Sequence, residues 1–178
     1  PSKFVITTKA QIKALVDARE SDPHSILGMH PGKKGRSSGL IVRAFLKGVV
    51  ACELVEVATD QVTPMDKVAA EGLFEVFLPK RREVFKYQLR AHYVSGEIRQ
   101  FHDAYRFLPT LGEQDLYLFN EGNEHRIYTK FGAHLRTVDE VGGVSFAVWA
   151  PSAKRISVVG NFNQWDGRYF PMRPLGNS

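Results

Sequence analysis

An internal repeat constrains the fold of this chain more than any other feature of its sequence. When the sequence is compared with itself at an offset of 104 residues, Gly39 falls on Gly143 and His30 falls on His134, with no gap over some thirty positions. Apolar positions coincide as well: Val42 with Phe146, Phe45 with Trp149, and Leu54 with Val158. Coincident glycine, histidine and apolar positions predict two copies of one architecture.

Short apolar runs fill the first copy. They are separated by Gly, Pro and Asp at roughly ten-residue spacing, as in antiparallel sandwiches. The predicted strands cover residues 40–46, 52–58, 73–78, 84–94 and 98–101, with no second long helix. In the second copy we expect strands at 144–149 and 156–159, joined by a polar turn at 151–155.

One short helix is predicted before the first strand. Thr8 and Gln11 have the spacing of a capping box, and Ile12, Leu15, Val16 and Arg19 come after them at helical intervals. The segment Ser21-Asp22-Pro23 should end the helix, because a residue before proline disfavours the helical conformation. A helix this short is marginal alone, so we expect it to dock on the chain that comes after it.

The domain organisation is predicted from the repeat. We expect an N-terminal segment at residues 1–23, a first β-sandwich module at 24–110, a connector at 111–127 and the first half of a second module at 128–178. The second copy lacks counterparts of the predicted strands 73–78 and 84–94. Because half a sandwich leaves strand edges unpaired, we expect the chain to be a fragment of a longer polypeptide.

The composition limits the classes of partner that we expect for this chain. The net charge of +5 is concentrated in two clusters, one at Lys33, Lys34 and Arg36 and the other at Lys80-Arg81-Arg82. We interpret both as solvated loop tips, with a phosphate-binding patch as the alternative, and expect no nucleic-acid partner. No apolar run approaches the roughly 18 residues that span a bilayer, so no membrane partner is expected. The single cysteine, Cys52, favours a reducing compartment.

No catalytic constellation is evident, so we predict no catalytic residue, no metal site and no cofactor in this chain. His30 and His134 occupy equivalent places, and we expect each to bond a loop carbonyl rather than to act as a ligand or base. The carboxylate pairs Glu53 with Glu56 and Asp139 with Glu140 are interpreted as solvating strand edges and turns.

The candidate binding site is the aromatic tip Gly160-Asn161-Phe162-Asn163-Gln164-Trp165. Trp165 either caps the sandwich core or offers its face to a pyranose ring, with Asn161, Asn163 or Gln164 bonding the hydroxyls. Residues 56–61 of the first copy carry no such aromatic side chain, so any site at the tip belongs to the second copy. Trp149, on a predicted strand, is expected in the core.

Several motifs resemble the amino-terminal portion of bacterial glycogen branching enzymes (1,4-α-glucan branching enzymes). They are Tyr105-Arg106-Phe107-Leu108-Pro109, Asp115-Leu116-Tyr117-Leu118-Phe119, Gly132-Ala133-His134, Val148-Trp149-Ala150-Pro151-Ser152-Ala153 and Val159-Gly160-Asn161-Phe162-Asn163-Gln164-Trp165. The Trp-Ala-Pro and Asn-Phe-Asn-x-Trp-Asp elements are shared with debranching enzymes and with other glycogen-binding modules. The two-copy arrangement narrows the resemblance to the long bacterial branching enzymes. The resemblance covers nearly the whole chain.

The resemblance implies an all-β fold of tandem immunoglobulin-like modules of the glycogen-binding type, the second incomplete. It implies an (α/β)₈ barrel of the α-amylase type downstream, which makes α-1,6 branches with carboxylates that lie outside this chain. It also implies α-glucan (glycogen or maltooligosaccharide) as partner, a cytoplasmic location, and Trp165 as stacking residue with Asn161 and Asn163 nearby. The alternatives are a stand-alone glucan-binding scaffold and a glycogen-debranching or trehalose-forming relative.

Overall fold

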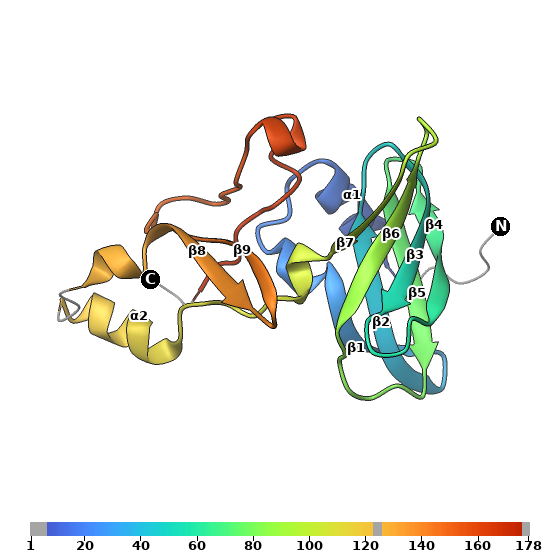
Figure 1. The fold of residues 1–178 in the computed structure, drawn as a ribbon, viewed down its shortest axis with the longest axis horizontal. Coiled ribbons are helices and arrows are strands. Elements are labelled where there is room, and N and C mark those ends of the chain that lie inside the picture. Colours follow the sequence, from blue (N-terminus) through green and yellow to red (C-terminus); the bar gives the residue numbers. More distant parts are fainter. Residues whose placement is uncertain (1–6, 123–125, 176–178) are drawn as a thin grey trace. The chain divides into compact units, whose positions relative to one another are not determined.

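The computed structural model describes residues 7–122 and 126–175, and the chain divides into two compact units, Pro1–Arg106 and Phe107–Ser178 (Figure 1). The first unit is mostly antiparallel β-structure, and the second contains a two-stranded antiparallel sheet. The helices of the described chain are short, so the predicted all-β class is confirmed. No helix in the described part of the chain combines the length and apolar character needed to cross a membrane.

Seven strands build the first unit, in the order β1-β2-β5-β4-β3-β6-β7. Their bounds are Gly28–Lys34 for β1, Ser37–Phe45 for β2, Val49–Glu56 for β3, Val62–Ala69 for β4, Leu73–Pro79 for β5, Tyr87–Tyr93 for β6 and Ile98–His102 for β7. The five predicted strands are therefore present with shifted ends, whereas β1 and β4 were missed. β4 links the two layers of the sandwich, since its first half pairs with β3 and its second half with β5.

Alternating side chains build the core between these layers. Along β6, Tyr87, Leu89 and Ala91 are buried, whereas the intervening Gln88 and Arg90 are only partly covered. This is the two-residue period of a strand with one face inward. The inward residues join Phe74, Leu54 and Cys52 in one apolar cluster.

A buried hydrogen bond closes the edge of this core. The Tyr87 hydroxyl donates to Asp103 Oδ2 at 2.5 Å, and the backbone N–H of Tyr105 donates to Asp103 Oδ1 at 3.1 Å. Burial raises the pKa of the Asp103 carboxyl, although both hydrogen bonds act in the opposite direction. Asp103 thereby ties the chain that leaves β7 to the core strand β6.

The Cys52 thiol should report on unfolding of the first unit. Its side chain is buried, and burial raises its pKa to about 12, with a smaller contribution from the Asp103 carboxylate. Because the thiolate is the reactive form, we expect a thiol reagent at pH 8 to label native Cys52 about 1,000-fold more slowly than the unfolded chain. Labelling that is quenched at successive times, with and without urea, measures this ratio of rates. Rapid labelling in native buffer would contradict the expectation.

Helix α1 (Lys9–Val16) begins as predicted and ends earlier than predicted. The Thr8 hydroxyl accepts from the Gln11 N–H and the Gln11 side chain accepts from the Thr8 N–H, so the capping box is confirmed. The helix stops at Asp17, because Ala18 adopts a left-handed conformation (φ 55°). The Arg19 N–H then donates to the Ala14 carbonyl at 2.9 Å, as in a Schellman motif, so placing Arg19 on the helix was wrong.

Two sets of contacts dock α1 on the sandwich. Leu15 packs in an apolar cluster with Ile26, Leu27, Phe45 and Leu73, which confirms the predicted docking. Before the helix, Arg43 Nε donates to Glu75 Oε2 at 2.9 Å and to Thr7 Oγ1 at 2.6 Å. All three of Thr7, Arg43 and Glu75 are buried.

The repeat is longer in the structure than in the sequence comparison. Helix α2 (Glu113–Asn120), the short 3₁₀ helix η3 (Ile127–Thr129) and strands β8 (Gly132–Val138) and β9 (Val141–Ala147) lie 104 residues after α1, η1 (Pro23–Ser25), β1 and β2, with identical lengths except that β2 is longer than β9. The register repeats too, since Gly28 pairs with Arg43 and Gly132 with Ala147. Each copy therefore opens with a helix, and α2, missed from the sequence, lies in the expected connector.

Both repeated histidines bond backbone, as predicted. His30 Nε2 lies 2.8 Å from the Leu27 carbonyl oxygen, and His134 Nε2 lies 2.8 Å from that of Phe131. The glycines two residues earlier, Gly28 and Gly132, have φ values of 89° and 96°. Each histidine thus closes the same left-handed turn that leads into a hairpin, which explains the repeated Gly-x-His.

An aromatic cluster in the second unit corresponds to a mainly aliphatic one in the first. Phe119, Phe131 and Trp149 take the places of Leu15, Leu27 and Phe45, with ring centroids 5.0 Å apart for Phe119 and Phe131 and 4.8 Å apart for Phe119 and Trp149. Trp149 nevertheless remains 50% exposed, so the prediction that it is core was wrong. In the first copy, Leu73 of β5 packs in this cluster and is fully buried, and the described part of the second copy has no counterpart of β5.

Candidate functional site

The tip of the second unit is held by a stem that differs from the predicted strand pair. Residues 156–159 do not pair with β9. Instead the Val158 N–H donates to the Phe170 carbonyl at 3.0 Å, and the Met172 N–H donates to the Ile156 carbonyl at 2.8 Å. Ser157 and Pro171 form an isolated antiparallel bridge between these segments. The chain from 159 to 169 is therefore a loop closed at its base.

Within this loop, Asn163 folds the turn. The short 3₁₀ helix η4 (Asn161–Asn163) comes after Gly160, whose N–H donates to Asn163 Oδ1 at 2.9 Å. Asn163 Nδ2 donates to the Val158 carbonyl at 2.9 Å, and the side chain is 7% exposed. Both polar ends of the amide are thus satisfied inside the turn, which fixes the backbone on which the neighbouring side chains stand.

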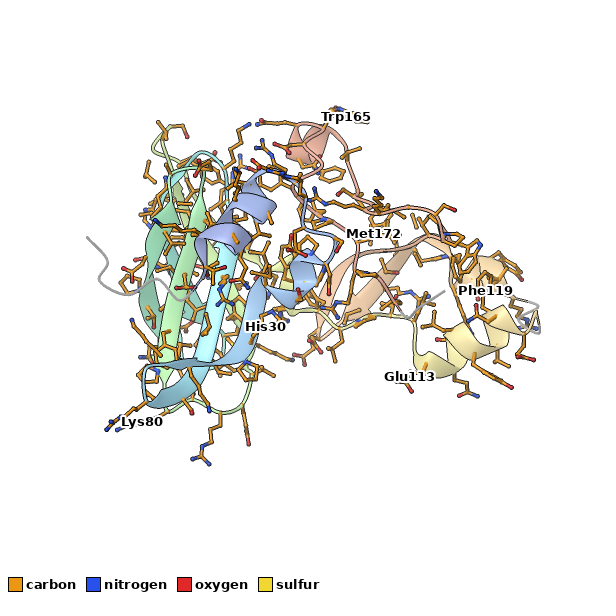
Figure 2. The ribbon with its side chains drawn as sticks, turned by 180° about the vertical axis from the view of Figure 1, so that it is seen from behind. His30, Lys80, Glu113, Phe119, Trp165 and Met172 are labelled. Carbon is orange, nitrogen blue, oxygen red and sulfur yellow. The ribbon has the colours of Figure 1, made fainter. Side chains whose placement is uncertain are left out.

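Trp165 stands at the outer end of the turn (Figure 2). Its side chain is 66% exposed, and its indole Nε1 donates to Asn161 Oδ1 at 3.0 Å. The backbone places it there through two successive left-handed residues, Gln164 (φ 55°) and Trp165 (φ 59°), and through a 3.0 Å bond from the Trp165 N–H to the Gly160 carbonyl. Asn161 therefore restrains the ring while the ring remains accessible.

A second aromatic side chain projects from the same turn. Phe162 is 68% exposed, and its ring centroid lies 5.8 Å from that of Phe170. A side chain at Gly160 would meet this ring, since a Cβ there would lie 2.5 Å from Phe162 Cε1. Beyond the turn, Arg168 forms a two-point ion pair with Asp166, Nε to Oδ1 at 2.9 Å and the terminal nitrogen to Oδ2 at 2.5 Å.

The equivalent loop of the first copy shares one left-handed residue with the tip and presents a different surface. Asp60 has the same φ of 55° as its counterpart Gln164, and the Glu56 carbonyl accepts the Asp60 N–H at 2.9 Å. At the position of Trp165 the first copy has the exposed Gln61. The two loops thus share one left-handed residue but differ in their hydrogen bonds, since the Trp165 N–H donates to the Gly160 carbonyl whereas the Glu56 N–H donates to the Gln61 carbonyl, and only the second loop presents an indole.

Within the residues that the structure describes, no group of three or more His, Cys, Asp and Glu side chains is placed to hold a metal ion. His92 Nε2 lies 3.2 Å from Glu53 Oε2, and Arg90 lies 3.6 Å from the same oxygen, so Glu53 of β3 contacts two side chains of β6. The Trp165 tip remains the candidate site.

Comparison with known proteins assigns the family. Residues 8–105 match the model of the N-terminal domain of the alpha-1,4-glucan branching enzyme GlgB. The chain belongs to this family. Residues 130–178 match carbohydrate-binding module 48, the isoamylase N-terminal domain, an immunoglobulin-like β-sandwich module. The Trp165 tip lies within this second match.

The relatives agree with this assignment. The chain is 43% identical over 176 residues to "1,4-alpha-glucan branching enzyme GlgB" of Synechococcus sp. (strain JA-3-3Ab), and the match covers 94% of the chain and 23% of that relative. It is 44% identical over 164 residues to the protein of the same name from Rhodospirillum rubrum, with 91% and 22% covered. The chain therefore corresponds to the N-terminal portion of these relatives and spans less than a quarter of their length.

Proposed function

We propose that this chain holds α-glucan, as glycogen or maltooligosaccharide, for a downstream α-amylase-type barrel of the same polypeptide that forms α-1,6 branches. The observation that carries the proposal is the exposed indole of Trp165, restrained by Asn161 on a loop within the carbohydrate-binding-module match. A flat ring of this kind stacks on the apolar face of a pyranose. The name of the relatives, 1,4-alpha-glucan branching enzyme, supports α-glucan as the ligand and branching as the reaction.

The three predicted site residues have different proposed roles. Trp165 is the stacking platform, and Asn161, itself exposed, orients it by accepting the indole N–H and keeps its amide nitrogen to donate to a sugar hydroxyl. Asn163 shapes the tip, because its amide already bonds Gly160 and Val158. We therefore assign sugar contact to Trp165 and Asn161 and a positioning role to Asn163.

We further propose that this segment is inactive alone and that its whole protein works in the cytoplasm. The paired carboxylates that a retaining glycosidase-type mechanism requires are assigned to the barrel. The buried free thiol of Cys52 supports a reducing compartment. The match of residues 8–105 to a branching-enzyme domain favours branching over debranching and over a stand-alone scaffold.

The substitution Trp165→Ala tests the binding proposal. Loss of one stacking aromatic should cost about 1–3 kcal/mol, by analogy with base stacking, which is roughly 5- to 150-fold in affinity. Calorimetry with maltoheptaose measures it on the whole chain. Gln61→Ala, at the equivalent position of the first copy, is the matched control and should bind like the unsubstituted chain. Unchanged affinity in a folded Trp165→Ala variant would rule out this platform.

A further inference from the structure

Two loops of the first unit carry the net positive charge of the whole chain. Residues 33–38 and 80–86 together hold seven basic residues and one acidic residue, a net charge of +6, against +5 for the complete chain. The remaining residues are therefore nearly balanced. A field of one sign that is concentrated in two short loops points to an anionic ligand.

The sheet brings these loops together although they lie far apart in the sequence. In the β2–β5 pair, Gly39 is opposite Pro79, so the β1–β2 turn and the chain that leaves β5 are neighbours. The Lys80 N–H donates to the Ser38 carbonyl at 3.1 Å. Lys80 accordingly lies at the end of the first unit where the β1–β2 hairpin turns (Figure 2). We call residues 33–38 and 80–86 the basic end.

The basic end combines a fixed guanidinium with exposed cations around it. Arg81 pairs with the buried Glu56 carboxylate and lies over the Phe85 ring, 4.8 Å from its centroid. Lys33, Arg36, Lys80 and Arg82 are exposed. A neutral α-glucan gains no electrostatic attraction from these charges. Binding of glucan at Trp165 therefore does not account for them.

We propose that the basic end binds phosphate monoesters carried on α-glucan. A phosphate monoester has a charge of about −1.5 to −2 at neutral pH and three acceptor oxygens, which suits several Arg and Lys donors at once. A polymer presents many such groups, so weak individual contacts add up. This inference rests on the proposed glucan binding, and it identifies a second ligand chemistry on the unit that lacks the indole.

The test compares one α-glucan bearing phosphate monoesters with the same glucan after phosphatase treatment, using the whole chain. From a few exposed ion pairs we expect about tenfold tighter binding of the phosphorylated glucan at low salt, falling as salt is raised. The triple variant Lys33→Glu/Arg36→Glu/Arg82→Glu should lose this difference. The control Lys9→Glu/Lys13→Glu/Lys154→Glu makes the same change in net charge on exposed positions elsewhere and should keep it.

The outcomes separate this inference from the proposed function. Trp165→Ala should weaken binding of both glucans by the same factor and leave the ratio of the two affinities unchanged. Loss of the Trp165 site and loss of the basic end therefore give different results. Equal affinity for the two glucans, or equal loss in the control variant, would overturn the proposal. Competition by glucose 6-phosphate, RNA or polyglutamate at matched charge, as effective as by the phosphorylated glucan, would also overturn it, in favour of a free phosphate ester, a nucleic acid or an acidic protein.

Discussion

Replacing Arg43 with methionine is expected to lower the free energy of unfolding of the first unit by about 3–5 kcal/mol. Arg43 and Glu75 face each other across β2 and β5, with side chains 11% and 4% exposed and Nε 2.9 Å from Oε2. Arg43 also donates to Thr7 Oγ1 and to the Ile26 carbonyl, so it ties the entry of α1 to the sheet. Its removal leaves the Glu75 carboxylate buried without this cation, while the Thr7 N–H still donates to it.

Urea unfolding followed by Cys52 labelling measures this loss in the first unit alone. Adding Glu75→Gln to Arg43→Met removes the buried charge and should recover part of the loss. The matched control is Arg90→Met, which breaks the half-exposed pair with Glu53 at 3.6 Å and should cost at most about 1 kcal/mol. Equal effects of Arg43→Met and Arg90→Met would show that burial of the pair is not what makes Arg43 important.

The second large effect is expected from Gly39→Ala. A Cβ at Gly39 would lie 2.2 Å from the Leu78 carbonyl oxygen and 3.0 Å from Phe77 Cε2. The nearer contact is backbone of the paired strand β5, which cannot move aside as a flexible side chain could. We therefore expect a loss of about 2–4 kcal/mol in the free energy of unfolding of the first unit.

The repeat supplies the control for this substitution. Gly143 is the counterpart of Gly39 on β9, and a Cβ there meets no heavy atom of the described chain within 4 Å. Gly143→Ala should therefore be neutral or slightly stabilising, because alanine restricts the unfolded chain more than glycine. Urea midpoints for both variants make the comparison, from Cys52 labelling for Gly39→Ala in the first unit and from tryptophan fluorescence for Gly143→Ala in the second, where Trp149 and Trp165 lie. A stable Gly39→Ala variant would mean that β2 and β5 are further apart than the structure has them.

The strands that the sequence failed to reveal have poor local signals. β1 contains Pro31 and two glycines. The proline is tolerated because β1 is an edge strand that pairs on one side only. β4 contains Pro64, Asp66 and Lys67, and most of its residues are exposed or half-buried. Both strands form because neighbouring strands provide partners, and that information is not local.

The candidate site remains a prediction, to which the structure adds the geometry of its residues. Trp165 and Asn161 were chosen from residue type, and the structure brings them into contact through the indole N–H. Nothing in the sequence distinguished Asn161 from Asn163, since both flank Phe162 and both are amides. Their difference is one of burial, because the 3₁₀ turn points Asn163 toward Val158 and leaves Asn161 outside.

The sequence by itself determined the features that depend on near neighbours: the capping box of α1, the alternation along β6, and the Gly-x-His turns that recur in the repeat. Tertiary structure alone decided the features that depend on partners far along the chain. These are the Arg43–Glu75 pair, the exposure of Trp149, the convergence of the basic loops and the stem that holds Trp165. The reason is physical, since capping and alternation act over a few residues whereas register is set by partners far along the chain.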